Sequence, residues 1–486
     1  MPCTADSPVP AESKGCAALL IVGGCLVLYA GALAWLAHQI ASSRLDVDTA
    51  ANWLVAFSVP AGLVYLLGLW PVTRNRLTGM KLLPILVIGF AMRAIVATSP
   101  PSLEDDYYRY LWDGAVTAHG LDPYRHSPTQ VVWGSIGAES VPSAFLPLAH
   151  EGGSVLQEIN HPDLTTIYPP IAQLAFAASH AIAPWSTYAW RAILLVADTI
   201  VLLLLLKLLR YLALPSTLIA WYWWNPILLR ETYGGAHMDV LAVPFVLAAI
   251  LLAERRRTTW ATMLLAFGSG VKLWPIVLLP VVLRRVNAPI RLLFPLGVFL
   301  LTLALVWLPT FPDGFGPQSG FLAYAAEWQN NAGAFRLIQH TLERALPLLG
   351  TPPVDFADTL ARYSVGALFL LCLAWQTSRP ITQRGDTLRR SLVIIAGMFL
   401  LSPTQFPWYY LWLLPFLVVS PRPSLLAYSV LLPLYYIHTA HPTFLWLEHT
   451  PVWLLLAWET IATRVRTRRS PRAVNRFGVP MVVQHV

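Results

Sequence analysis

Residues 16–41 read CAALLIVGGCLVLYAGALAWLAHQIA, a run that contains no acidic residue, lysine or arginine. A helix needs about twenty apolar residues to cross the hydrocarbon core of a bilayer. The run is too long for the core of a signal peptide and lacks a convincing cleavage site, so we expect an uncleaved helix. This segment therefore predicts a first membrane crossing.

Apolar runs of this kind recur along the chain. They fall near 51–72, 82–98, 187–209, 212–230, 238–253, 291–308, 359–376, 391–402, 407–420, 424–440 and 450–463. Of the 486 residues 56% are hydrophobic and 12% are charged, whereas soluble domains carry about a quarter charged residues. The composition excludes a soluble enzyme, a disordered chain and a secreted disulfide scaffold. We predict an all-α polytopic membrane protein with about 12–14 transmembrane helices, forming one domain over residues 1–463.

Positive charge is concentrated in short bursts between the apolar runs, and the formal net charge is +8. The bursts include 255–257, 284–291 and 379–390, and the basic tail 464–486. This placement is typical of cytoplasmic loops and argues against binding to nucleic acid. With the N-terminus and the tail inside, the segments expected outside are 99–166, 309–358, 403–406 and 441–449.

Two apolar stretches fit poorly as simple crossings. Residues 168–184 contain a helical run bracketed by prolines that is only about 20 Å long, so we expect a half-crossing. Residues 259–283 have basic clusters at both ends and a Gly-Ser-Gly break at 268–270, which favours a re-entrant pair of half-helices. Broken backbone at membrane depth is tolerated where it lines protein or a watery cavity, so both stretches indicate a site.

The outer segment 99–166 holds 9 of the 25 acidic residues, and we expect it to form short amphipathic helices on the outer leaflet. Its first motif, residues 104–114, reads EDDYYRYLWDG. In a helix, Asp106, Arg109, Tyr110 and Asp113 would share one face. Carboxylates at the mouth of a membrane cavity are partly desolvated and suit general-base chemistry. The alternative is a solvated helix start, where the helix dipole stabilises acidic side chains.

The order of several motifs resembles that of the bacterial GT-C glycosyltransferases, and more narrowly the polyprenol-phosphate-mannose-dependent mannosyltransferases, including glycosyltransferase family 87. The motifs span about residues 105 to 410 and each is weak alone. They are Asp105–Gly114, Gly120–Tyr124, Thr165–Pro170, Trp224–Pro226, Gly234–Asp239, Val271–Pro275 and Pro403–Tyr409. The resemblance implies a GT-C-like bundle of helices with a large first extracytoplasmic loop, 99–166, that carries the catalytic residues.

The resemblance also implies roles for residues of the first loop. An aspartate of this loop acts as general base in that family, and the position matches Asp106, with Asp105 as second choice. Arg109 is then a candidate for the donor phosphate, because a guanidinium matches phosphate oxygens in a fork. An intrahelical pair of Arg109 with Asp105 or Asp113 is the alternative. Substrate contacts are further expected from Tyr110, Asp113 and Tyr168.

Three ionisable residues are predicted at membrane depth, where unpaired charge is costly and therefore usually functional. His237 and Asp239 follow two glycines, and His237 could donate to a phosphate or a sugar hydroxyl. Lys272 lies beside the Gly-Ser-Gly break and could bind the lipid phosphate. The alternatives are a satisfied interfacial histidine and a lysine that snorkels to the interface.

Aromatic and amide side chains complete the predicted site. Sugar C–H faces pack on aromatic rings and amides bind hydroxyls, so Trp408, Tyr409 and Asn331, together with Trp328, are candidate sugar contacts. Most of the 20 tryptophans and 18 tyrosines would nevertheless belong to interfacial belts. The sequence shows no metal-ligand spacing. It leaves open a divalent cation that bridges a loop carboxylate and the phosphate.

Together these features predict a hexosyltransferase of the bacterial inner membrane with its active site on the extracytoplasmic face. We expect it to move one hexose, most readily mannose, from a polyprenyl-phosphate donor to a glycolipid or glycan acceptor. A lipid-linked glycan polymerase and a polyprenyl-lipid flippase or transporter are the alternatives. A transporter should show an internal repeat, and none is evident between the halves.

Overall fold

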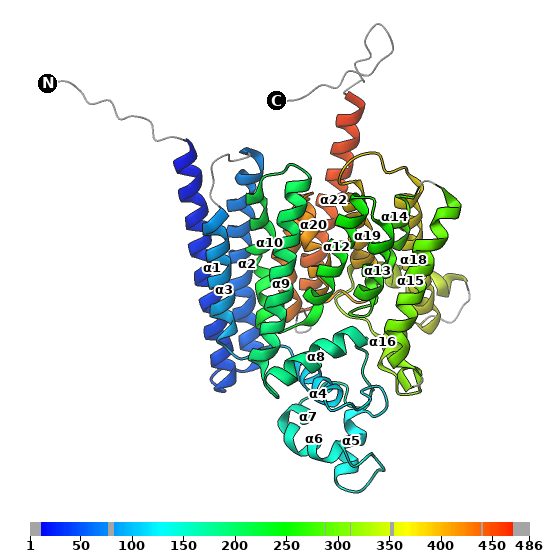
Figure 1. The fold of residues 1–486 in the computed structure, drawn as a ribbon. Helices are drawn as coiled ribbons and strands as arrows, with labels where there is room; N and C mark the ends of the chain where they lie inside the picture. Colours follow the sequence, from blue (N-terminus) through cyan, green and yellow to red (C-terminus); the bar gives the residue numbers. More distant parts are fainter. Residues whose placement is uncertain are drawn as a thin grey trace, which may run out of the picture.

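The fold is described by a computed structural model that covers residues 11–75, 82–286, 288–311, 313–349, 354–438 and 441–469. Within these ranges the chain forms helices and turns, and the only strand-like pairings are two isolated bridges. The prediction of an all-α protein is confirmed. Figure 1 shows most helices standing side by side as a bundle, with a smaller lobe at one end.

Five helices of the described chain are long and apolar enough to cross a membrane unbroken. They coincide with five of the apolar runs that the sequence predicts as crossings. They are α1 (Ala11–Ala41), α2 (Val47–Asn75), α9 (Thr187–Tyr211), α15 (Pro289–Trp307) and α18 (Val354–Ser378). Three further predicted runs are also single helices in the bundle. They are α3 (Leu82–Ala97), α19 (Asp386–Leu401) and α22 (Thr443–Arg469).

The other apolar runs are broken into short pieces. Prolines at their starts remove backbone donors and separate one piece from the next. The run 212–230 gives η1 (Ser216–Ile219), α10 (Ala220–Trp223) and α11 (Pro226–Leu229). The run 407–420 gives η8 (Pro407–Trp412) and α20 (Leu414–Leu417), and 424–440 gives α21 (Pro423–Leu431) and η9 (Leu432–Ile437). The described chain therefore has fewer unbroken crossings than its apolar runs predict.

One break is a sharp bend at residues 235–237. The segment Pro226–Gly234, which ends in the π-helix η2 (Arg230–Gly234), meets the segment Met238–Glu254 at 106°. The second segment contains η3 (Met238–Ala242) and α12 (Val243–Glu254). A side chain at Gly235 would lie 2.8 Å from the ring of His237, so the tight bend requires glycine there. The bend brings Glu231, His237 and Asp239 close together.

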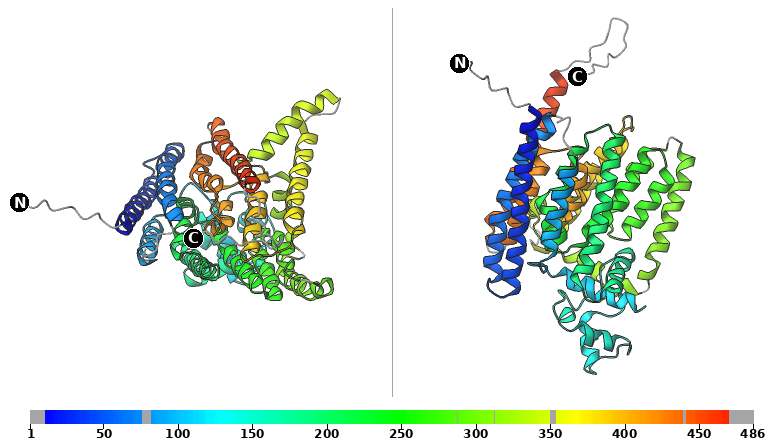
Figure 2. Two further views of the ribbon diagram at one scale, coloured as in Figure 1. Left: turned by 90° about the horizontal axis from the view of Figure 1, so that it is seen from above. Right: turned by 60° about the vertical axis from the view of Figure 1, so that its left-hand side comes forward.

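The segment 99–166, the first of those expected outside, forms the lobe. It consists of α4 (Asp106–Ala118), α5 (Pro128–Ser135), α6 (Phe145–Gly152) and α7 (Ser154–Gln157). The predicted short helices are confirmed, and they share a small apolar core built around Trp112, Val131, Phe145 and Leu156. Figures 1 and 2 show the lobe at the end of the bundle opposite to the start of α1 and the end of α22.

The two irregular stretches meet each other. The first is the 13-residue helix α8 (Pro170–Ile182), which packs on α4. The second breaks where expected, because α13 (Thr258–Ser269) ends at the glycines and the chain returns through η4 (Trp274–Leu278) and α14 (Leu279–Leu283). The backbone N–H of Ile171 donates to the carbonyl of Gly270 at 2.8 Å. The start of α8 therefore caps the break after α13.

Several basic bursts gather at the end of the bundle away from the lobe. Glu254 accepts a 2.5 Å ion pair from Arg285 and hydrogen bonds from the backbone of Gly385 and Thr387. The connections 255–257, 284–288 and 379–385 are thus held around one buried carboxylate. The segment 441–449, expected outside the membrane, lies mostly in α22, and the tail beyond Arg469 lies outside the described residues.

Candidate active site

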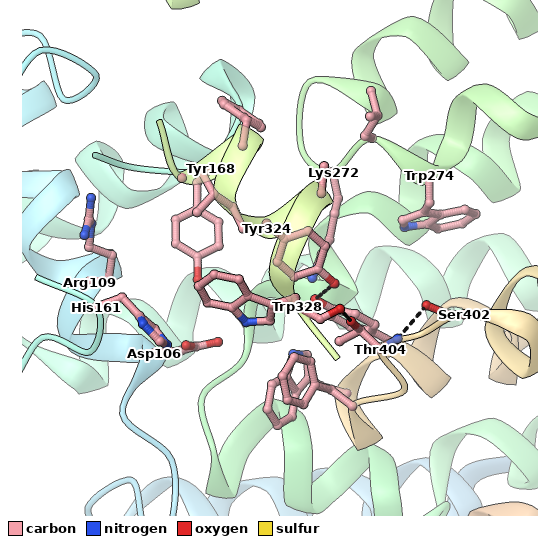
Figure 3. A pocket seen from close by; sticks show the side chains of 18 of the residues that line it. Asp106, Arg109, His161, Tyr168, Lys272, Trp274, Tyr324, Trp328, Ser402 and Thr404 are labelled. Atoms are coloured by element: carbon pink, nitrogen blue, oxygen red, sulfur yellow. Dashed lines mark hydrogen bonds between the residues drawn. The ribbon is translucent and has the colours of Figure 1, made fainter. Parts of the chain in front are cut away.

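A cavity of about 690 Å³ lies where the lobe meets the bundle. Its walls come from four parts of the chain, namely residues 104–109, 160–169, 272–274 and 320–328, with further residues between 398 and 435. Figure 3 shows Asp106, Arg109 and His161 on one side, Lys272 and Trp274 on the other, and Trp328 between them. Three of the segments expected outside therefore converge on one cavity.

The acidic side of the cavity is the start of α4. Asp106 is the first residue of this helix, and its carboxylate accepts from the amide of Asn160 at 3.0 Å and the hydroxyl of Tyr110 at 3.3 Å. The same amide of Asn160 donates to Asp105 at 2.6 Å. Asn160 thus fixes two neighbouring carboxylates in place and leaves part of Asp106 open to the cavity.

The three consecutive acids differ in their electrostatics. Desolvation and the charge of Glu231 raise the pKa of Glu104 well above its usual range. Partial desolvation and the adjacent Asp106 carboxylate raise the pKa of Asp105. Burial alone would also raise the pKa of Asp106, but His237, Asn160 and Lys272 together bring it below its ordinary value. Asp106 is therefore the acid of this trio best suited to be ionised at neutral pH.

The opposite side of the cavity carries its positive charge. Lys272 follows the break after α13, and its ammonium donates to Oδ1 of Asp239 at 2.6 Å. The same carboxylate oxygen accepts from the indole of Trp412 at 2.7 Å. The ammonium lies 4.2 Å from the centre of the Tyr409 ring, which adds a cation–π contact. Lys272 remains partly exposed to the cavity, so it can still bind an anion.

Aromatic rings form the walls between these two sides. Trp408 stacks on Phe406 with ring centres 4.4 Å apart, and the hydroxyls of Tyr324 and Tyr409 lie 2.9 Å apart. Trp328 lies 4.6 Å from the ring of His161, at the acidic side. Flat apolar rings beside charged groups suit a ligand that combines sugar faces with an anion.

The predicted site residues fall into three groups. Asp105, Asp106, Arg109, Tyr168, Lys272, Trp408 and Tyr409 line the cavity. Tyr110, His237 and Asp239 lie behind it and each contacts a lining residue. Asn331 lies away from it, buried, where its amide donates to Glu448 at 2.8 Å.

Asp113 serves the lobe rather than the cavity. It is 1% exposed and accepts from Arg109, Thr166 and Gln173. Arg109 also donates to the carbonyl of Leu164 at 3.0 Å. The intrahelical pair of Arg109 with Asp113 is therefore present, and it ties α4 to the strand-like segment before α8.

The cavity also contains residues that the sequence did not single out. They are Asn160, His161, Trp274, Tyr324 and Tyr435, and Glu231 lies just behind. Glu231 carried a usable signal, because it is an acid within an apolar stretch. Tyr324 lies in the short helix α16 (Gly320–Glu327), and the others lie in loops and broken helices without a periodic pattern. Within the described chain, no group of three or more His, Cys, Asp or Glu side chains has the geometry to hold a metal ion.

Comparison with known proteins identifies a family. A sequence model of the MptA_B family, described as alpha-(1->6)-mannopyranosyltransferase, N-terminal domain, matches residues 14–288. No curated protein and no solved structure gave a significant match. The matched range covers more than half of the chain and includes Asp106, His237 and Lys272. The chain belongs to the alpha-(1->6)-mannopyranosyltransferase family.

Proposed function

We propose that this protein transfers mannose from a polyprenyl-phosphate donor to a hydroxyl of a glycolipid or glycan acceptor, at the outer face of the bacterial inner membrane. The observation that carries the proposal is one cavity with the carboxylate of Asp106 on one side and the partly exposed ammonium of Lys272 on the other. Membership in a mannosyltransferase family favours sugar transfer over polymerisation or lipid transport.

The chemistry follows from these two side chains. The acceptor oxygen forms a bond to C1 of the mannose while the bond from C1 to the phosphate oxygen breaks, and the phosphate leaves with the electron pair. Asp106 takes the proton of the acceptor hydroxyl. Lys272 stabilises the charge that grows on the leaving phosphate, in a cavity where water is sparse and such contacts are strong.

The surroundings of Lys272 suit a lipid-linked phosphate. Leu273 lines the cavity and is 54% exposed, and Trp274 lies beside it. An apolar exit next to the ammonium would let a prenyl chain pass from the phosphate towards the bilayer. The aromatic walls around Trp328 and Trp408 would hold the sugar rings.

Turnover by purified protein in lipid nanodiscs tests the proposal. The assay offers radiolabelled polyprenyl-phosphate mannose and a lipid-extract acceptor, with GDP-mannose and a polyprenyl-diphosphate-linked sugar as competing donors. We expect transfer from the monophosphate donor only, and a loss of about 10²–10⁴-fold in kcat for Asp106→Asn. Asp122→Asn, in the same lobe but outside the cavity lining, is the matched control. Full activity of Asp106→Asn, or transfer only from another donor, would reject the proposal.

The membrane face is tested separately. Glu139 is exposed at the far side of the lobe, so a Glu139→Cys variant can be labelled in intact cells with a reagent that does not cross the membrane. We expect labelling from outside. Labelling only after the membrane is broken would place the cavity on the cytoplasmic face.

A further inference from the structure

His237 lies directly behind the cavity. Its side chain is 0% exposed, and its ring lies flat on Trp408, with ring centres 3.8 Å apart and planes 13° apart. Trp408 lines the cavity and His237 does not. The ring therefore does not reach a bound sugar or phosphate, and any effect it has on the reaction must pass through another residue.

Both ring nitrogens of His237 face carboxylates. Nδ1 lies 3.6 Å from Oδ2 of Asp106, and Nε2 lies 3.7 Å from Oε2 of Glu231 and 3.9 Å from Oε2 of Glu104. Neither nitrogen has a hydrogen-bond partner. A neutral imidazole has one donor and one acceptor, whereas the imidazolium has two donors. Two nitrogens turned towards acids at ion-pair distance therefore suit the imidazolium.

The backbone around His237 fixes this position. The ring follows the bend at Gly234-Gly235, and Ala236 adopts a left-handed φ of 59°. The carbonyl of Ala236 accepts from the indole of Trp190 at 2.7 Å, and the N–H of His237 donates to the carbonyl of Glu231 at 3.0 Å. Strained backbone that is held by such contacts is typical of functional sites.

We propose that His237 is a positioning residue that keeps Asp106 ionised and oriented as the base when substrates fill the cavity. The inference rests on the proposed function. Substrates would strip water from Asp106, and the adjacent carboxylate of Asp105 would add negative charge, so both effects favour protonation of Asp106. The imidazolium of His237, on the side of Asp106 away from the substrate, opposes both of these effects.

Other groups also act on Asp106, and they limit the size of the effect. From the lobe these are Glu104, Asp105, Tyr110, Asn160 and Tyr168. From the bundle they are Lys272, Tyr324, Tyr409 and Tyr435, whereas Glu231 faces the ring of His237. Lys272 is a second cation and lies on the cavity side of Asp106, but it would pair with a bound phosphate. His237 is then the cation left to Asp106 during the reaction.

The test is the pH profile of kcat, which reports ionisation in the enzyme–substrate complex, for transfer by the full-length protein in nanodiscs. The base works when Asp106 has lost its proton, so activity falls on the acid side as Asp106 becomes protonated. Removal of His237 raises the pH at which this happens. We expect His237→Gln and His237→Phe to move the acid limb up by about one pH unit or more. Activity should recover at alkaline pH, with the donor KM within about twofold of wild type.

Two controls separate this role from a structural one. His180→Gln removes another buried histidine, in α8 and outside the cavity lining, and should leave the acid limb in place. In an Asp106→Asn background, His237→Gln should cause no further loss. Gln retains a donor and Phe retains the stacking on Trp408, so folding is checked for each by thermal unfolding.

The outcomes distinguish the two proposals. Absence of transfer by the wild type with polyprenyl-phosphate mannose would reject the proposed function itself. An active wild type together with an unmoved acid limb in a folded His237 variant would overturn the role of His237 alone. Loss of folding in both variants would also overturn it, because His237 would then be needed for the fold.

Discussion

Two of the ionic clusters in the described chain, one in the core of the bundle and one beside the cavity, differ in their internal contacts. The core cluster consists of Arg93, Asp198, Tyr222 and Tyr233, and Asp198 accepts from all three partners at 2.7–2.8 Å. The cavity cluster consists of Asp106, Glu231, His237, Asp239 and Lys272. There the imidazole makes no hydrogen bond, and Oδ2 of Asp239 has no partner.

This difference separates a stabilising cluster from one that is available for chemistry. A buried charge is costly unless it is fully paired, and the core cluster meets that condition at Asp198. Arg93 further lies over the Trp223 ring at 3.4 Å. The cavity cluster leaves its charges only partly paired, so they can respond to a substrate. We therefore expect substitutions in the core cluster to cost stability and those in the cavity cluster to cost activity.

The largest expected effect is in the core cluster. Asp198→Asn leaves the guanidinium of Arg93 without its counter-ion in a low-dielectric interior, which typically costs about 3–5 kcal/mol. Unfolding in mixed micelles measures this loss. Asp358→Asn removes a partly exposed partner of Arg362 in α18 and should cost less than about 1 kcal/mol. Equal losses in the free energy of unfolding for the two variants would contradict the comparison. A lower transfer rate per folded molecule in Asp198→Asn would contradict it as well.

The next effect is in the cavity cluster. The double variant Lys272→Met with Asp239→Asn replaces a buried ion pair by neutral groups, so its stability should match or exceed that of the wild type. Donor binding should weaken about 10–100-fold, because a hydrogen bond from a charged group is worth about 1.5–3 kcal/mol. Titration of tryptophan fluorescence with the donor measures this affinity. Unchanged donor affinity would remove Lys272 from the phosphate site.

A smaller effect is expected at the aromatic wall. Trp328→Ala removes a ring that lines the cavity, and an aromatic contact of this kind is worth about 0.5–1.5 kcal/mol. We expect kcat/KM to fall about three- to tenfold with little change in stability. Trp133→Ala removes an exposed indole of the lobe that is not part of the cavity lining. If both variants lose activity equally, the sugar-contact role of Trp328 is wrong.

The sequence predicted which helices form better than how they break and contact one another. Hydropathy found the unbroken helices, because a long apolar run fixes both length and environment. It did not show that 407–420 and 424–440 are broken, since proline positions and not hydropathy decide this. The breaks at Gly268–Gly270 and before α8 were predictable from glycine and proline. Their contact through Ile171 and Gly270 was not, because it depends on tertiary packing.

The candidate site shows the same division. Asp106 was identified from the family resemblance and Lys272 as a charge at predicted membrane depth, and both line one cavity. His237 and Asp239 were expected to contact substrate, but they lie behind Asp106 and Lys272. Motif order reports which residues are near a site and not which of them face it. Asn331 was chosen as an amide beside Trp328, yet its side chain donates to Glu448 of α22.

The smallest expected effect, at Glu104, links the cavity cluster to pH. Desolvation and the charge of Glu231 raise the pKa of Glu104, so the folded protein holds this proton more tightly than the unfolded chain does. As pH rises above the ordinary pKa of a glutamate, the unfolded chain loses the proton first and native stability falls.

Glu104→Gln removes this dependence, because the amide does not ionise. Relative to wild type, the variant should therefore be indistinguishable near pH 4 and become more stable as pH rises, with a slope of at most about 1.4 kcal/mol per pH unit. Thermal unfolding across this range measures the difference, and Glu158→Gln, an exposed position in the lobe, supplies the baseline. A stability difference that is constant with pH, or that shrinks as pH rises, would mean that Glu104 is ionised beside Asp106. The start of α4 would then not combine one charged acid with one neutral acid.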